Sequence, residues 1–231
     1  MNERDNTSLN QMKSSDKAYL LDLNPQTLKD KVVLVRVDYN VPLNGTHKFH
    51  WVDNDSKIRT SIETLNYLVT HEAKVVVITH LGHPNQCSAM NDGQKQIHLE
   101  FDASFTTRNL MYKIINLLGD EVKISFCEDC IGPIRHRAIE LMHAGSILLC
   151  ENVKYYREDE ICDPFFSQKL SEDIDIFVNE AFSISHKAYS SNYGIVNYIQ
   201  PCPIHVAGFN FHAEIACLES CLSNPQRPFC A

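Results

Sequence analysis

Short runs of apolar residues recur along the chain, and several are rich in β-branched side chains that do not alternate with polar ones. Strands without such alternation are typical of a sheet that is covered on both faces. The pattern therefore predicts a weaker strand at His205–Phe209 and five clear strands at Val32–Val37, Val75–Thr79, Val122–Phe126, Ser146–Cys150 and Asp175–Asn179.

Between these runs, apolar residues repeat at helical spacing, beside residues that commonly start or end helices. In chain order, the predicted faces and end signals are Ile58, Ile62, Leu65 and Val69 after a cap at Asp55 or Ser56; Leu110, Ile114 and Leu117 before Gly119; Pro133, Ile134, Ala138 and Leu141 before Gly145; Asp163, Pro164, Phe165 and Leu170; and Ile215, Leu218 and Leu222.

The order strand, helix, strand indicates crossover connections, which join parallel strands. We therefore predict an α/β fold, a three-layer, doubly wound (Rossmann-like) parallel sheet of about six strands flanked by helices. Residues 1–17 are polar and are predicted to be a flexible tail. Residues 18–223 form the predicted domain, with a polar insertion at about residues 85–96.

The composition is that of an ordinary globular protein, with 44% hydrophobic and 22% charged residues. A net charge of −8 argues against general nucleic-acid binding, so an anion site must be a local cluster of cations. No apolar run approaches a membrane span of about 20 residues, and the first residues lack the apolar core of a signal peptide. The nine scattered cysteines favour reduced thiols, and a cytoplasmic protein is expected.

Polar and cationic residues follow the predicted strands. Because the carboxyl ends of parallel strands lie at one edge of a sheet, these residues are expected to meet there. They are Asp38, Asn40 and Lys57 after the first strand, His80 and His83 after the second, Lys154 after the fourth, and His186 and Lys187 after the fifth. Cations that hold an anion, beside Asp38 and Asn40 for a hydroxyl, predict a pocket for a small phosphorylated or carboxylated ligand. The alternative is that each residue is an ordinary solvated loop residue.

Two motifs that resemble metal or redox sites have simpler explanations. Cys127 and Cys130 form a C-x-x-C motif, but a zinc site would need a second ligand pair at closer spacing. The acidic residues between these cysteines oppose a stabilised thiolate, which argues against a redox pair. His80 and His83 lack a third ligand in a visible motif, so no metal site is expected. Trp51 is interpreted as packing within the long loop after the first strand.

Several longer strings resemble phosphoglycerate kinase, and they occur here in the order found in that family. They are "KVVLVRVDYNVPLNG", "KIRTSIETLNYLV", "AKVVVITHLGHP", "CEDCIGP", "GSILLCENVKYYREDE", "NEAFSISHKAYSS" and "NPQRPFCA". The resemblance runs from about Leu20 to Ala231 and covers the amino-terminal, substrate-binding half of the family's enzymes. In these enzymes one doubly wound domain holds 3-phosphoglycerate and a second holds Mg-ATP or Mg-ADP. They transfer a phosphoryl group between ATP and the substrate carboxylate after hinge closure.

The resemblance carries over to individual residues of the predicted pocket. Asp38, Asn40, His80 and His186 match substrate-contacting residues of the family. The family has arginine at the positions of Lys57, His83, Lys154 and Lys187, of which the first steadies the transferring phosphoryl group and the others bind the substrate's phosphate. Lysine keeps the charge but loses the planar fork that grips phosphate, which predicts a weakened site. The family's glycine is replaced by Ser183, and its aspartate by Glu180 in "NEAF".

The resemblance also implies what this chain should not bind. The 231 residues contain eight glycines and no G-x-x-x-x-G-K motif, so no ATP site is expected here. Residues 224–231 match the hinge and first strand of the nucleotide domain, and their apolar residues would need cover, for example from a protein partner.

Two functional hypotheses follow from the resemblance. The first is a phosphoglycerate kinase, or part of one, that acts in glycolysis. The second is a non-catalytic relative that retains weak binding of small anions and has a binding or regulatory role. Because of the four replaced arginines, no turnover is expected from the chain itself.

Overall fold

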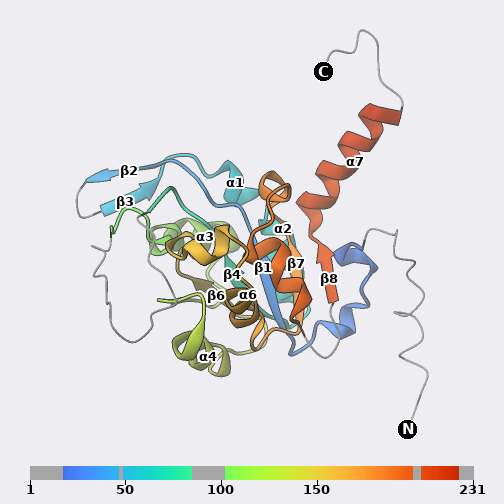
Figure 1. Cartoon of the computed structure of the whole chain (residues 1–231), viewed down its shortest axis with the longest axis horizontal. Helices are drawn as coiled ribbons and strands as arrows, with labels where there is room; N and C mark the ends of the chain where they lie inside the picture. Colours follow the sequence, from blue (N-terminus) through green and yellow to red (C-terminus); the bar gives the residue numbers. More distant parts are fainter. Residues whose placement is uncertain (1–17, 47–48, 85–101, 200–203, 224–231) are drawn as a thin grey trace.

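Six parallel strands form the central sheet of the molecule (Figure 1). The computed structural model describes residues 18–46, 49–84, 102–199 and 204–223. The strands of the sheet lie in the order β5-β6-β4-β1-β7-β8, and every neighbouring pair is parallel. Their bounds are β1 Val32–Arg36, β4 Lys74–Ile78, β5 Ile124–Cys127, β6 Ile147–Cys150, β7 Ile176–Asn179 and β8 Ile204–Ala207. All six predicted strands therefore exist, with ends that differ by one or two residues.

Successive residues of the central strands enter two different cores. In β1, Val33 and Val35 pack in one core while Leu34 packs in the other. In β4, Val75 and Val76 divide between the two cores in the same way. Both faces of these central strands are therefore buried, which explains why their sequences are continuous apolar runs.

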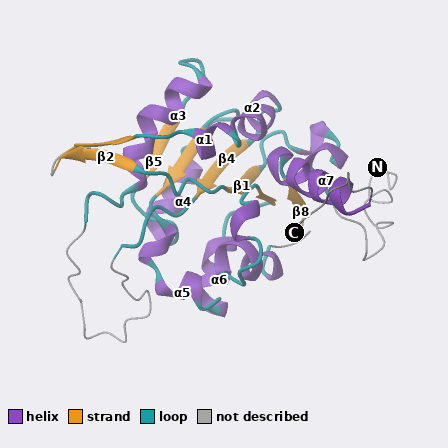
Figure 2. Cartoon of the chain, turned by 90° about the horizontal axis from the view of Figure 1, so that it is seen from above, coloured by secondary structure: helices purple, strands orange, loops and turns teal. Residues whose placement is uncertain are grey.

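Helices cover both faces of the sheet, as Figure 2 shows, with α2 and α3 on one side and α4 and α6 on the other. Leu65 of α2 and Ile114 of α3 belong to the first core, and Ile139 of α4 and Phe166 of α6 to the second. The predicted three-layer, doubly wound α/β fold is confirmed. The helices are α1 Ser56–Arg59, α2 Ile62–Thr70, α3 Met111–Leu118, α4 Gly132–Glu140, α5 Arg157–Glu160, α6 Pro164–Ser171 and α7 Phe209–Ser223.

The first predicted helix is broken into α1 and α2. Ser61 donates its hydroxyl to the carbonyl of Ile58, and Thr60 donates to that of Lys57. Such side-chain hydroxyls compete with the backbone for helical partners. Asp55 occupies the N-cap position of α1 without a side-chain cap, because its carboxylate binds Arg59 instead.

The predicted buried face of α4 is confirmed at Ala138, which packs against the second core, and is wrong at the other two residues. Ile134 and Leu141 are 55% and 62% exposed, whereas Ile139 and Arg135 are buried. Arg135 is held inside by donating to four backbone carbonyls, those of Cys130, Lys169, Leu170 and Glu172. The helix also ends at Glu140, five residues before the glycine that was expected to close it.

Short helical turns occupy many of the connections. They are the 3-10 turns η2 Leu20–Asp22, η3 Pro25–Thr27, η4 Thr107–Leu110, η5 Val153–Tyr155, η6 Phe182–Ile184 and η8 Ile195–Asn197, and the π-helical turn η7 Ser190–Gly194. The loop after β1 contains an antiparallel hairpin that the sequence pattern did not predict, β2 Leu43–Thr46 and β3 Phe49–Val52. Trp51 lies on this hairpin and is 51% exposed, so it is packed only in part.

The last helix, α7, projects from the body of the molecule in Figure 1. It begins at Phe209, which the sequence pattern had placed in the last strand. Leu218 and Leu222 are 49% and 75% exposed. None of the helices within the described ranges is long and apolar enough to cross a membrane.

Several predictions fall outside the described residues. They are the flexible tail at residues 1–17, the polar insertion at 85–96, and the hinge and strand at 224–231. Of the nine cysteines, the six in the described ranges are free thiols. Cys130 donates its thiol to the carbonyl of Glu151, and burial raises its pKa. A hydrogen bond with Cys150 lowers the pKa of Cys127 to about 7, although burial acts in the opposite sense.

Candidate substrate-binding site

A pocket of about 130 Å³ lies at the carboxyl edge of the sheet. The loops that follow β1, β4, β6 and β7 all contribute to it. Its lining residues are Arg36, Asn40, His80, His83, Lys154, Asp159, Glu160, Ile184, His186, Lys187 and Tyr189. Six of the eight predicted site residues are therefore brought together, and the other two, Asp38 and Lys57, lie beside the pocket.

Arg36 is the most deeply buried cation of this pocket, and sequence reasoning missed it. Its Nε donates to the hydroxyl of Ser191 at 3.0 Å, and the backbone amide of Ser191 donates to Asp159 at 2.8 Å. Burial lowers the pKa of Arg36, and the negative charge of Asp159 opposes that effect. Arg36 was visible as one cation inside the apolar run "VVLVRV", which is the signal that could have identified it.

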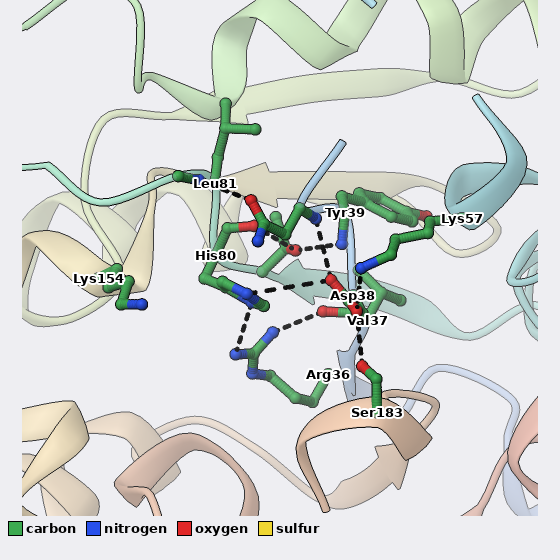
Figure 3. Close-up of polar contacts among 12 residues, drawn as sticks. Arg36, Val37, Asp38, Tyr39, Lys57, His80, Leu81, Lys154 and Ser183 are labelled. Carbon is green, nitrogen blue, oxygen red and sulfur yellow. Dashed lines mark hydrogen bonds and ion pairs between the residues drawn. The ribbon is translucent and has the colours of Figure 1, made fainter. Parts of the chain in front are cut away.

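His80 lies against Arg36 and is neutral. Burial, followed by the positive charge of Arg36, lowers the pKa of His80 to about 3. Nη2 of Arg36 lies 3.4 Å from Nδ1 of His80, and because arginine can only donate, Nδ1 is the acceptor and Nε2 carries the proton. Nε2 of His80 points toward Asp38, as Figure 3 shows. The distance from this nitrogen to Oδ1 of Asp38 is 4.0 Å.

Asp38 is held by donors from three parts of the chain (Figure 3). Lys57 donates from Nζ to Oδ2 at 2.8 Å, Ser183 donates to the same oxygen at 2.5 Å, and the amide of Asn40 donates to Oδ1 at 3.0 Å. Burial acts to raise the pKa of Asp38, but these hydrogen bonds and the neighbouring His80 outweigh it and leave the pKa below its usual value. Asp38 is therefore a carboxylate at neutral pH.

Asn152 fixes the relative positions of two pocket loops, and sequence reasoning did not single it out. Its amide group accepts from the backbone of Leu81 at 3.2 Å and of Lys154 at 3.0 Å, and donates to the carbonyl of Leu81 at 2.7 Å. Asn40 makes a similar link, because its side-chain oxygen accepts from the amide of Gly82 at 2.9 Å. The loops after β1, β4 and β6 are therefore tied together by side-chain amides.

Lys154 and His83 face each other in the pocket. Nζ of Lys154 lies 3.1 Å from Nδ1 of His83 and 3.4 Å from a carboxylate oxygen of Glu160. The side chain of Lys154 is only 13% exposed. A lysine ammonium donates only, so Nδ1 of His83 accepts from it.

His186 and Lys187 close the pocket from the loop after β7, and both side chains are exposed. Their loop is held by Asn192, whose side chain donates at 2.9 Å to the carbonyls of Ile184 and Lys187. Asn192 thus holds the backbone of this loop, and the loop presents two exposed side chains to the pocket.

The chemistry of this pocket suits a small anion. Arg36, Lys154 and Lys187 bring positive charge, which Asp159 and Glu160 offset in part. Within the described ranges, no group of three or more histidine, cysteine, aspartate or glutamate side chains could hold a metal ion.

A larger open hollow of about 430 Å³ lies elsewhere, between the hairpin β2–β3 and the segments around Gly82 and Phe105. Its lining includes none of the predicted site residues.

Comparison with known proteins identifies the family. The family model described as phosphoglycerate kinase matches residues 22–231. The chain is 36% identical over 210 residues to phosphoglycerate kinase 1, chloroplastic, of Arabidopsis thaliana, covering 91% of this chain and 39% of the relative. It is 37% identical over 214 residues to phosphoglycerate kinase of Dictyoglomus turgidum, covering 92% and 48%. A cytosolic phosphoglycerate kinase of Nicotiana tabacum is 35% identical over 204 residues.

Solved structures agree with the sequence comparison. Phosphoglycerate kinase from Pyrococcus horikoshii superimposes with a TM-score of 0.72 at 27% identity, over 91% of this chain and 47% of the other. The enzyme from Coxiella burnetii shares the fold, with a TM-score of 0.70 at 24% identity. The chain thus spans about half the length, or less, of the proteins it matches. On this evidence, the chain belongs to the phosphoglycerate kinase family.

Proposed function

We propose that the pocket binds a small phosphorylated carboxylate of the 3-phosphoglycerate type. The observation that carries this proposal is the convergence of Asn40, His80, Lys154 and Lys187 from four separate loops on one pocket. Buried Arg36, beside His80, adds a positive charge that favours an anionic ligand. Membership of the family supplies the substrate class.

Binding is expected to be weaker than the family's arginines would give. Lys154 and Lys187 offer a point charge, whereas arginine grips phosphate with two parallel hydrogen bonds. Lys154 must also leave His83 and Glu160, which are within 3.1 and 3.4 Å of its ammonium. A hydrogen bond to a charged group contributes about 1.5–3 kcal/mol, so each lost bond lowers affinity by about tenfold or more.

The proposal assigns substrate binding, and no phosphoryl transfer, to the 231-residue polypeptide. Lys57 stands where the family has the arginine that steadies the phosphoryl group, and its ammonium is bound to Asp38 at 2.8 Å. Loss of such an arginine lowers phosphoryl-transfer rates by about 10³–10⁵. Mg-ATP or Mg-ADP is assigned to the family's second domain, and not to residues 18–223. A cytoplasmic location belongs to the same proposal.

Calorimetric titration of the chain with 3-phosphoglycerate tests the pocket. Lys154→Gln removes a cation from the pocket and should weaken binding about tenfold. The matched control is Lys169→Gln, because Lys169 of α6 is paired with Glu172 and neither residue lines the pocket. Equal affinity for wild type and Lys154→Gln, or no heat change at millimolar ligand, would refute the proposed site.

A coupled assay with ATP and 3-phosphoglycerate tests the second part of the proposal. The purified polypeptide is expected to bind 3-phosphoglycerate without consuming ATP. Turnover that scales with protein concentration and is lost in Lys57→Ala would show that the chain is a complete catalyst.

A further inference from the structure

Ser183 stands where the family resemblance implies glycine, in the turn η6 that follows β7. Its hydroxyl donates to Oδ2 of Asp38 with an O–O distance of 2.5 Å. The same oxygen accepts from Nζ of Lys57 at 2.8 Å. In Figure 3 the two donors reach Asp38 from opposite sides. A carboxylate oxygen has two lone-pair sites, so Oδ2 is saturated by the protein's own donors.

The other carboxylate oxygen of Asp38 has one hydrogen bond and faces His80. Oδ1 accepts from the amide of Asn40 at 3.0 Å and lies 4.0 Å from Nε2 of His80. Asp38 does not line the pocket, although Asn40, His80 and Ile184 do. The residue expected to hold a ligand hydroxyl is therefore bound to groups of this chain and lies beside the cavity.

We propose that Ser183 sets the ligand specificity of the pocket by giving Asp38 the hydroxyl that a substrate would otherwise provide. The inference rests on the proposed function, because it concerns the same pocket. A ligand hydroxyl binds Oδ2 of Asp38 only by displacing Ser183 or Lys57, and exchanging one hydroxyl donor for another brings no net hydrogen bond. The pocket therefore recognises the anionic groups of its ligand and discriminates little on the hydroxyl. Its ligand class is small phosphorylated carboxylates, with or without a hydroxyl beside the carboxylate.

Two ligands that differ by one hydroxyl test this inference. They are 3-phosphoglycerate and 3-phosphonooxypropanoate, which is the same molecule without its 2-hydroxyl. Calorimetry of the full chain is expected to give dissociation constants within about threefold of each other for wild type. Ser183→Ala should bind 3-phosphoglycerate about tenfold more tightly than the other ligand, which is the scale of one hydrogen bond to a charged acceptor.

Two further variants separate the role of the hydroxyl from general effects on the turn. Ser185→Ala changes a serine of the same segment whose hydroxyl donates to the carbonyl of Phe182 at 2.7 Å, and Ser183→Thr keeps a hydroxyl at the proposed position. Both variants should bind the two ligands with similar affinities, as wild type does. The readout is the ratio of two affinities for one pocket, which a loss of stability alone does not move.

The outcomes distinguish this inference from the function on which it rests. A wild-type preference for 3-phosphoglycerate of about tenfold, left unchanged by Ser183→Ala, would overturn the role of Ser183 while supporting the pocket. A Ser183→Ala variant that binds both ligands equally would also overturn it. Failure of both ligands to bind wild type and every variant would overturn the proposed function itself.

Discussion

At the scale of single residues, burial makes two ionisable side chains of the pocket into fixed partners. Arg36 is 1% exposed and His80 has a side chain that is 12% exposed. Because Arg36 keeps its charge, His80 avoids a second buried positive charge by remaining neutral, with its pKa lowered to about 3. The pair therefore presents one positive charge at neutral pH.

The stability of the protein should depend on His80 in mildly acidic solution. Between pH 6.5 and about 3, the unfolded chain binds a proton at His80 and the folded chain does not. The contribution of neutral His80 to the free energy of unfolding is therefore lost as the pH falls. From pH 7 to pH 5 the free energy of unfolding should decrease by about 2 kcal/mol more in wild type than in His80→Gln. Urea unfolding at the two pH values measures both proteins.

The matched control for this pH dependence is His136→Gln. His136 is a surface histidine whose bond to Asp173 raises its pKa, so the wild-type protein gains stability from it as pH falls. Removal of His136 should therefore act in the opposite direction. Parallel pH profiles for wild type and His80→Gln would contradict a buried neutral His80.

At the scale of elements, α7 is joined to the sheet by a buried carboxylate. Glu180 directly follows β7 and accepts from Thr64 of α2 and from the backbone amides of Asn210 and Phe211. Burial raises the pKa of Glu180, and the hydrogen bond from Thr64 is the largest effect that opposes it. A Cβ at Gly208 would collide with this carboxylate, so a larger residue just before the helix would force Glu180 to move.

Removal of the Glu180 carboxylate should destabilise the protein. Glu180→Ala leaves the amides at the start of α7 without their acceptor, and a buried donor without a partner costs about 1–3 kcal/mol. Chemical unfolding measures the loss. Glu128→Ala is the control, because Glu128 has a side chain that is 74% exposed in a surface pair with Arg108 and should change stability by less than about 1 kcal/mol. Equal effects of the two substitutions would contradict the role of Glu180.

The elements themselves were largely predictable, for physical reasons that differ between strands and helices. Strands such as Val75–Thr79 were evident because burial on both faces leaves only apolar residues. The hairpin β2–β3 was missed because it is short and partly exposed, so it needs no apolar pattern. The face of α4 was misassigned because Arg135 is buried by carbonyls from distant segments, a compensation that no local pattern reveals.

At the scale of the whole molecule, parallel strands bring loops that are far apart in sequence to one edge. This follows from topology alone, which is why most of the pocket could be predicted before its contacts were known. The partners of each side chain could not be predicted in this way. Lys57 binds Asp38, and Lys154 faces His83. These contacts depend on the side-chain conformations, which the order of strands and loops does not determine.

The most direct test of the account follows the four pocket loops together during ligand binding. In an NMR titration of the isotope-labelled chain with 3-phosphoglycerate, the amide signals of Asn40, Gly82, Lys154 and Lys187 should shift and saturate with one common dissociation constant. Signals of Lys169 and Glu128, outside the pocket, should remain unchanged. Shifts confined to a single loop, or spread over the exposed lysines without saturation, would contradict a shared anion pocket at the carboxyl edge of the sheet.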